Sequence, residues 1–204
     1  MNGANTVTKF LFDLDGTLTK VETLPLIAKT FHVKGIEGLT RETILGRIPF
    51  EESLARRVSM LRDLPVDEVA LLLGNVEVYP LLAEFIRKYR ESCCLVTGNL
   101  SCWIALLTKK LGCTCYASEA EVADNRIKKL TRILRKEEIV RGFQEEGHRV
   151  VMIGDGNNDV DAMHLADHSV AVGLTHAPAK SVLAVANHVF FDEKALCGYL
   201  ESLL

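Results

Sequence analysis

Short apolar runs alternate with amphipathic stretches along most of this chain. The clearest runs are KFLFDLDG (9–16), CCLVTGN (93–99), RVVMIGDGNND (149–159), HSVAVGL (168–174) and HVFF (188–191). Their lengths suit strands, and the stretches between them repeat apolar residues at helical spacing. Strands that are apolar throughout are typical of sheets buried on both faces. The pattern therefore predicts an α/β fold with a mainly parallel sheet.

Residues 21–80 interrupt this alternation, because they show helical periodicity and no convincing strand. Within them, RIPFEESLARRVSMLRDLPVDEVALLL (47–73) predicts two amphipathic helices separated at Leu64 and Pro65. We therefore predict a small helical insertion over 21–80, placed after the first strand. The remainder of the chain, 1–20 and 81–204, would form the α/β core.

Polar residues suited to catalysis end three of the apolar runs. They are Asp13 and Asp15 in the first, Thr97 in the second and Asp155 in the third. The carboxyl ends of parallel strands gather at one edge of a sheet, where open α/β folds bind their ligands. We expect these four side chains to share one site.

Asp13 and Asp15 are two residues apart, so in an extended segment their side chains project to the same side. Two carboxylates placed in this way suit a hard cation such as Mg²⁺. They also suit a division of labour between nucleophile and general acid–base. A surface Asp-Gly turn at Gly16 is the alternative.

The stretch GDGNND repeats the theme at the end of another predicted strand. Asp155 is a candidate metal ligand there. Asn158 and Asp159 stand at the start of the next helix, where helix capping is the alternative explanation.

The stretch LVTGN supplies a hydroxyl and a flexible backbone at a third strand end. The Thr97 hydroxyl and the Gly98 amide suit a phosphate oxygen. A strand-to-helix turn capped by Asn99 would explain the same residues.

Helical phase selects the candidate cation for an anionic ligand. Ile139, Val140 and Phe143 follow Lys136 by three, four and seven residues, so Lys136 falls on the apolar stripe of its helix. An inward lysine needs an anion, and a phosphate is a good candidate. The alternative is a lysine whose stem is buried while its ammonium group reaches water.

The same criterion separates two neighbouring arginines in the predicted insertion. Arg57 lies within the apolar face of its helix, whereas Arg56 points away from it. The Arg57 guanidinium therefore suits a buried carboxylate, either of a ligand or of Glu51 or Glu84. The residues that define the apolar face are Phe50, Leu54, Val58 and Leu61.

Composition changes this picture little. The chain has 204 residues and a formal net charge of −3, without the basic excess that nucleic-acid binding requires. No apolar run is long enough to span a membrane, and the polar start MNGANTVTK does not resemble a secretory signal. The six cysteines include no C-x-x-C pair, so we expect reduced thiols and a cytoplasmic protein. The sequence leaves the oligomeric state open.

The series DLDGT, LVTGN, inward Lys136 and GDGNND resembles the haloacid dehalogenase superfamily of aspartate-nucleophile phosphatases, over essentially the whole chain. Within that superfamily, LTKVETLP and PFEESLARRVSMLRDLPVDEV resemble the phosphoserine phosphatase branch. The resemblance implies a Rossmann-like core with a small helical cap inserted after the first strand.

The resemblance also implies roles for the candidate residues. Asp13 would attack phosphorus and form an aspartyl-phosphate, and Asp15 would protonate the leaving alcohol and then activate water. Mg²⁺ would be held by the Asp13 carboxylate, the Asp15 backbone carbonyl and Asp155, with support from Asp159. The expected ligands of the phosphoryl oxygens are Thr97, Gly98, Lys136 and Asn158.

The implied substrate is phosphoserine or a close phosphorylated amino acid. Glu22 would face its ammonium group and Arg57 its carboxylate, whereas Asn99 replaces a glycine that is usual in this branch. Three alternatives remain: another small phosphate ester, transfer to an acceptor alcohol such as homoserine, and a non-catalytic binding domain. The last is disfavoured because Asp13, Asp15 and Lys136 are all present.

Overall fold

The computed structural model describes residues 7–204, so residues 1–6 of the polar N-terminal stretch lie outside it. A seven-stranded sheet has the order β4-β3-β2-β1-β5-β6-β7. The strands are β1 (Thr8–Phe12), β2 (Cys93–Leu100), β3 (Thr114–Ala123), β4 (Arg126–Arg132), β5 (Arg149–Gly154), β6 (His168–Val172) and β7 (His188–Phe190). All neighbours pair in parallel except β3 and β4, which confirms the predicted α/β class.

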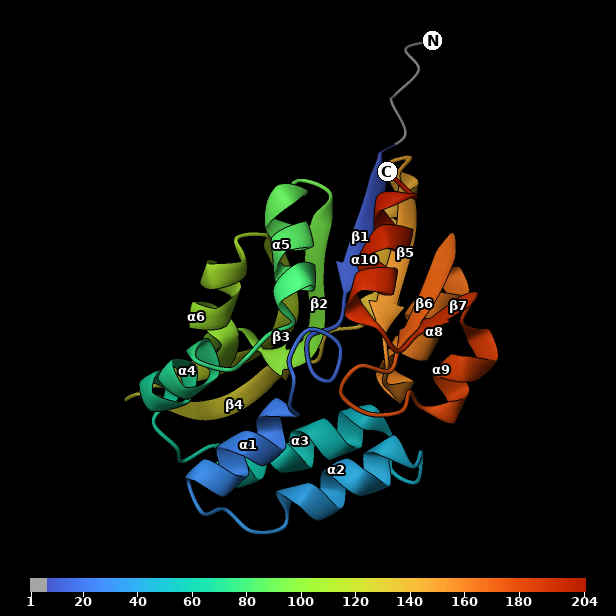
Figure 1. The fold of residues 1–204 in the computed structure, drawn as a ribbon. Helices are drawn as coiled ribbons and strands as arrows, with labels where there is room; N and C mark the ends of the chain where they lie inside the picture. The colour runs from blue at the N-terminus through green and yellow to red at the C-terminus, as the bar shows by residue number, and fades with distance from the viewer. Residues whose placement is uncertain (1–6) are drawn as a thin grey trace.

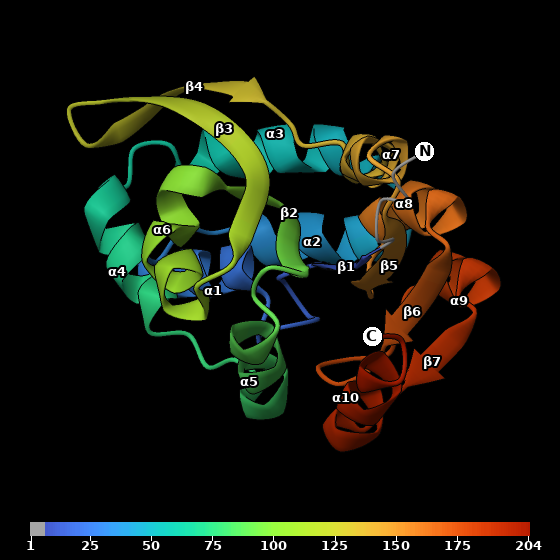
Figure 2. The ribbon, with the colours of Figure 1, turned by 90° about the horizontal axis from the view of Figure 1, so that it is seen from above.

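Helices cover both faces of this sheet, and further helices lie beyond one of its ends (Figures 1 and 2). They are α1 (Thr23–Thr30), α2 (Ile36–Ile44), α3 (Phe50–Leu61), α4 (Val66–Gly74), α5 (Pro80–Lys88), α6 (Ser101–Leu111), α7 (Lys136–Glu145), α8 (Val160–Leu165), α9 (Lys180–Val185) and α10 (Glu193–Glu201). A single 3-10 turn, η1 (Asn157–Asp159), precedes α8.

The central strand β1 explains why its sequence is apolar throughout. It lies between β2 and β5, and Phe10 is in register with Cys93 on one side and Val151 on the other. Phe10 and Phe12 face the core shared with α5, α6 and α10, whereas Leu11 faces the core shared with α7, α8 and α9. Because both faces are covered, alternation with polar residues is absent from this strand.

The segment after β1 is helical, as the sequence predicts. Helices α1, α2 and α3 lie together at the end of the sheet toward which β1 points (Figure 1). The predicted break at Leu64 and Pro65 is confirmed, since α3 ends at Leu61 and α4 begins at Val66. Helix α4 turns back beside α6, where Gly74 lies against Leu106. The division into a core and a separate cap remains a prediction.

The hairpin of β3 and β4 is an element that periodicity did not predict as strands. Its solvent side is charged along both strands, which removes the apolar signal. Asp124 and Asn125 form the turn with positive φ values of 51° and 59°, a conformation that asparagine and aspartate tolerate in tight hairpins. β3 pairs with β2 in its first half and with β4 in its second.

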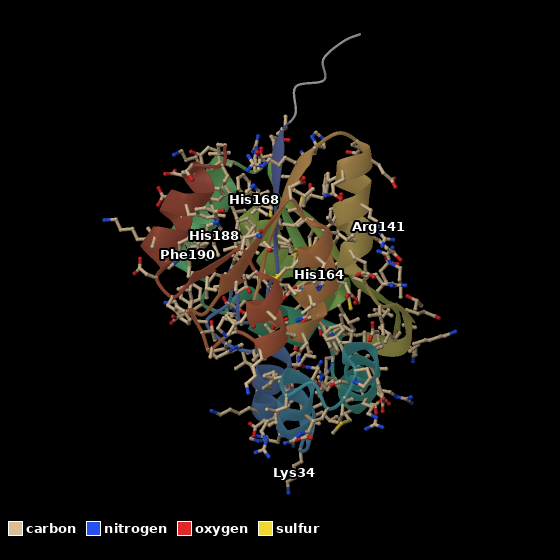
Figure 3. The ribbon with its side chains drawn as sticks, turned by 90° about the vertical axis from the view of Figure 1, so that its right-hand side faces the viewer. Lys34, Arg141, His164, His168, His188 and Phe190 are labelled. Atoms are coloured by element: carbon tan, nitrogen blue, oxygen red, sulfur yellow. The ribbon has the colours of Figure 1, made fainter. Side chains whose placement is uncertain are left out.

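In Figure 3, His188 and Phe190 of β7 lie beside α10, and both rings stack on Tyr199 with centroid distances of 4.5 and 5.2 Å. Lys34 marks the outer end of the helical layer in the same view. Among the helices within 7–204, none has the length and apolar character required to cross a membrane.

Candidate active site

The site begins where β1 ends. The Asp13 amide donates to the Ile153 carbonyl at 2.8 Å, so the ladder with β5 continues up to the first aspartate. The chain then turns at Gly16, which has a φ of 76°. A Cβ at that position would lie 2.7 Å from Asp155 and 2.8 Å from His176, so both the conformation and the packing require glycine.

Three carboxylates and one lysine form the buried centre of the site. Oxygens of Asp13, Asp155 and Asp159 lie within 4.8 Å of one another. The Lys136 ammonium lies 2.7 Å from Asp13 and 2.5 Å from Asp159, with only 2% of the side chain exposed. The expectation that Lys136 points inward is therefore confirmed, and its anions are these two carboxylates.

Negative charge exceeds positive charge in this cluster, and the pKa values reflect that. Burial raises the pKa of Asp13 well above its usual value, against the opposing charge of Lys136. Burial and the charge of Asp159 raise the pKa of Asp155 to about 8. Burial also disfavours the charged form of Lys136, but the two carboxylates outweigh it and raise its pKa.

The acidic group has the chemistry of a divalent-metal site. Asp13, Asp155 and Asp159 present oxygen atoms only, which Mg²⁺ and Mn²⁺ prefer. A divalent cation would balance the charge that one lysine leaves over. The Asp155 carboxylate is already oriented, because the Thr17 hydroxyl donates to it at 2.5 Å.

The Asp15 side chain turns away from this metal-binding group. Its two oxygens accept from the Thr23 amide at 2.8 Å and from the Asn99 side-chain amide at 3.3 Å. Burial, followed by the charge of Glu22, raises the pKa of Asp15. A carboxyl group with a raised pKa beside a nucleophile suits a general acid–base. A contribution of its backbone carbonyl to a metal site remains a prediction.

A pocket opens between the strand ends and the helices α1, α2 and α3. Thr97, Gly98 and Asn158 line it beside Asp13 and Asp15. The Phe50 ring lies directly on Gly98, where any side chain would collide with it. The structure thus brings three of the four residues predicted to bind phosphate to this pocket, whereas the fourth, Lys136, pairs with Asp13 and Asp159 and does not line it.

The pocket is also lined by the two residues predicted to recognise the substrate, Arg57 on α3 and Glu22 close to Asp155. Arg57 is buried and faces the pocket, and its guanidinium donates only to Ser53 and Thr40 oxygens within the described chain. The intramolecular partners Glu51 and Glu84 are therefore not the explanation for its burial. Burial lowers the pKa of Arg57.

Arg56 provides the contrast, since it is exposed and pairs with Glu52 at 2.5 Å. Helical phase therefore distinguished the two arginines correctly. Glu22 also lines the pocket, at the start of α1.

His176 is a site residue that the sequence did not reveal. Its Nε2 atom lies 3.0 Å from Glu22 and 3.4 Å from Asp155. The hydrogen bond with Glu22, which outweighs the effect of burial, raises the pKa of His176 to about 9. His176 follows β6 by four residues, so attention to this fourth strand end would have found it.

The interpretation of Asn99 as a helix cap is wrong. Helix α6 begins at Ser101 with Leu100 at its N-cap position and no side-chain cap. The Asn99 side chain instead reaches across to Asp15 and Thr23. The capping alternative holds for Asp159, because its carboxylate accepts from the Gly156 amide at the start of η1. The same carboxylate also binds Lys136 and the Asp155 amide, so capping is only part of its role.

Comparison with known proteins agrees with this geometry. The family model described as haloacid dehalogenase-like hydrolase matches residues 9–167. Phosphoserine phosphatase of Methanocaldococcus jannaschii is 28% identical over 177 residues, which cover 79% of this chain and 83% of that protein.

Other relatives are longer proteins. SerB2, a phosphoserine phosphatase of Mycobacterium tuberculosis, is 27% identical over 89% of this chain and 48% of its own length. The chain also spans 47% of the phosphoserine phosphatase of Archaeoglobus fulgidus, at 29% identity. For these two relatives the match covers about half of the protein.

Solved structures show the same fold. A phospho-aspartyl intermediate analogue of phosphoserine phosphatase matches with a TM-score of 0.81 and 25% identity, over 96% of this chain and 99% of that one. A substrate-bound phosphoserine phosphatase complex matches with a TM-score of 0.82 and 24% identity over the same shares. The chain belongs to the haloacid dehalogenase-like hydrolase family and resembles its phosphoserine phosphatases.

Proposed function

We propose that this protein is a metal-dependent phosphomonoesterase that hydrolyses a small phosphorylated amino acid, with phosphoserine as the first candidate. The observation that carries the proposal is a single pocket lined by Asp13 and Asp15 together with Arg57 and Glu22, with the Lys136 ammonium group 2.7 Å from Asp13. The similarity to proteins named phosphoserine phosphatase supports phosphoserine as the first candidate.

The reaction divides into two steps. In the first, an Asp13 oxygen attacks phosphorus, the bond between phosphorus and the ester oxygen breaks, and Asp15 gives its proton to the leaving alcohol. In the second, Asp15 takes a proton from water as that water attacks the phosphoryl group. Phosphate leaves and the Asp13 carboxylate is restored.

The charges of the site suit this chemistry. An anionic nucleophile must approach an anionic phosphate, and Lys136 lies within 2.7 Å of that nucleophile. Mg²⁺ held by Asp13 and Asp155, with Asp159 in support, would offset the remaining negative charge. Thr97, Gly98 and Asn158, which line the pocket, are proposed to hold the phosphoryl oxygens together with Lys136.

Substrate selection is proposed to rest on Arg57 and Glu22. Arg57 is a buried cation with no carboxylate partner among the described residues, and it faces the space where the substrate tail would lie. A planar guanidinium binds a carboxylate through two parallel hydrogen bonds. Glu22 would accept from the ammonium group. This arrangement favours an amino acid over an uncharged alcohol.

Two further assignments belong to this proposal. The helical segment 21–80 acts as a cap over a core formed by 1–20 and 81–204. The protein works in the cytoplasm, a reducing compartment, in line with six cysteines that are all free.

A phosphate-release screen tests the proposal. Purified protein is assayed with Mg²⁺, and with chelator, on O-phosphoserine, O-phosphothreonine, sugar phosphates and p-nitrophenyl phosphate. We expect the highest kcat/KM for O-phosphoserine and no turnover in chelator. Faster turnover of sugar phosphates would overturn the substrate but not the reaction. Lower phosphate release with added homoserine, with phosphohomoserine appearing, would instead favour the phosphotransferase.

A further inference from the structure

Asn99 stands at the end of β2 with its side chain almost fully enclosed, at 3% exposure. Its side-chain amide nitrogen lies 3.3 Å from an Asp15 oxygen and 2.6 Å from the Thr23 hydroxyl. Its side-chain oxygen accepts from the Leu100 amide at 2.8 Å. Every polar atom of this side chain is therefore engaged within the site.

These contacts fix which way the amide faces. The Leu100 amide can only donate, so it requires the oxygen of Asn99 on its side. The nitrogen is then directed at Asp15 and Thr23. The opposite orientation would place an oxygen against the Asp15 carboxylate and an NH₂ group against a backbone N–H.

Asp15 is consequently held at both ends of its carboxyl group. One oxygen accepts from the Thr23 amide and the other from Asn99. The Thr23 hydroxyl also accepts from Asn99, which closes a ring of three residues through the Thr23 backbone amide. Rotation of the carboxyl group would break one or both of these bonds, so its plane relative to Asp13 is set by Asn99.

We propose that Asn99 is a positioning residue, which holds the Asp15 carboxyl group in the orientation that delivers its proton to the leaving alcohol. The inference rests on the proposed phosphatase function and adds to it the residue that orients the acid. It predicts that the benefit of Asn99 depends on the leaving group. An alkyl alcohol needs a proton as it leaves, whereas p-nitrophenol leaves readily as an anion.

The test compares single-turnover rates of alcohol release, with enzyme in excess, for O-phosphoserine and p-nitrophenyl phosphate. This regime isolates the first step from hydrolysis of the intermediate. We expect Asn99→Gly to slow serine release at least about tenfold, part of the 10²- to 10⁴-fold that general acid catalysis supplies. Release of p-nitrophenol should change by less than about threefold. Substrate affinity should change little for either compound.

Two further variants keep the inference falsifiable. Thr23→Val removes the hydroxyl that holds the Asn99 amide but keeps the backbone donor to Asp15, so it should slow serine release selectively to a smaller extent. Asn75→Ala is the matched control, because Asn75 is exposed and its side chain bonds only to the Leu71 carbonyl in the described structure. It should behave as the wild type with both substrates.

The outcomes separate this inference from the proposed function. If Asn99→Gly slows alcohol release from both substrates equally, or from neither, the positioning role of Asn99 is overturned while the proposed phosphatase function stands. A variant that fails to fold is recognised by its circular dichroism, and Thr23→Val then decides. If the wild type releases neither alcohol, the proposed function fails and the inference fails with it.

Discussion

Replacement of Lys136 by methionine is the perturbation whose size follows most directly from the structure. The lysine side chain is 2% exposed, and its ammonium group is shared between Asp13 and Asp159, which are 6% and 0% exposed. Methionine has a similar length and no charge. The variant therefore keeps the packing while leaving buried carboxylates without their cation.

Removal of one partner from a buried ion pair typically costs about 3–5 kcal/mol, because the remaining charge stays desolvated. For a chain of this size, each kcal/mol lowers the Tm by about 2–4 °C. We expect Lys136→Met to melt about 6–20 °C below the wild type in chelator. The deficit should grow between about pH 5 and about pH 8, because loss of the lysine raises the carboxyl pKa values in the folded state and deprotonation then disfavours folding.

Thermal and urea unfolding in chelator, followed by circular dichroism, measure this difference. Lys109→Met serves as the control, because Lys109 is an exposed lysine on α6. It should unfold within about 0.5 kcal/mol of the wild type. Equal stability of the Lys136 and Lys109 variants across the pH range would refute the argument that a charge-balanced cluster lies at the centre of the site.

Three other predictions concern the metal and the substrate. Burial and the charge of Asp159 raise the pKa of Asp155 to about 8, so Mg²⁺ must displace a proton when it binds. The affinity for Mg²⁺ should therefore rise from about pH 6.5 to about pH 8.5, with proton release measured by calorimetry. An affinity that does not depend on pH would contradict this. His176→Ala removes a positive charge that lowers the pKa of Asp155, so the rise of Mg²⁺ affinity with pH should move to higher pH; an unchanged pH profile would contradict this. Arg57→Met should lower kcat/KM for O-phosphoserine about 10- to 100-fold and leave kcat/KM for p-nitrophenyl phosphate unchanged. Arg56→Met, the control, should change neither value. Equal losses on both substrates would count against recognition of a carboxylate by Arg57.

Periodicity predicted much of this fold because burial follows it closely. β1 is apolar throughout, since helices cover both of its faces. The phase of α7 placed Lys136 inside, and the phase of α3 placed Arg57 inside and Arg56 outside. Periodicity did not predict β3 and β4 as strands, because their exposed, charged face carries no apolar pattern and β3 is held in the sheet by its pairing with β2.

The site residues at the ends of strands could be predicted from the sequence. Residues whose role depends on contacts with distant parts of the chain could not. Asp13 and Asp155 meet because β1 and β5 are neighbours in the sheet. The alternation of elements predicted that strand ends gather at one edge of the sheet, but not the order of the strands. The contact of His176 with Glu22 joins residues 154 positions apart, so no local sequence pattern predicts this contact. The sequence left the role of Asn99 open for the same reason, since its partner Asp15 is 84 positions away.

Chemical trapping of the intermediate tests the central claim most directly. The enzyme is mixed with O-phosphoserine and Mg²⁺, quenched in acid within one turnover, digested and analysed by mass spectrometry. We predict one added phosphoryl group on the peptide that contains Asp13, absent in chelator and absent in Asp13→Asn, which should also release no phosphate. An unmodified Asp13 peptide, together with full phosphate release by Asp13→Asn, would contradict the account.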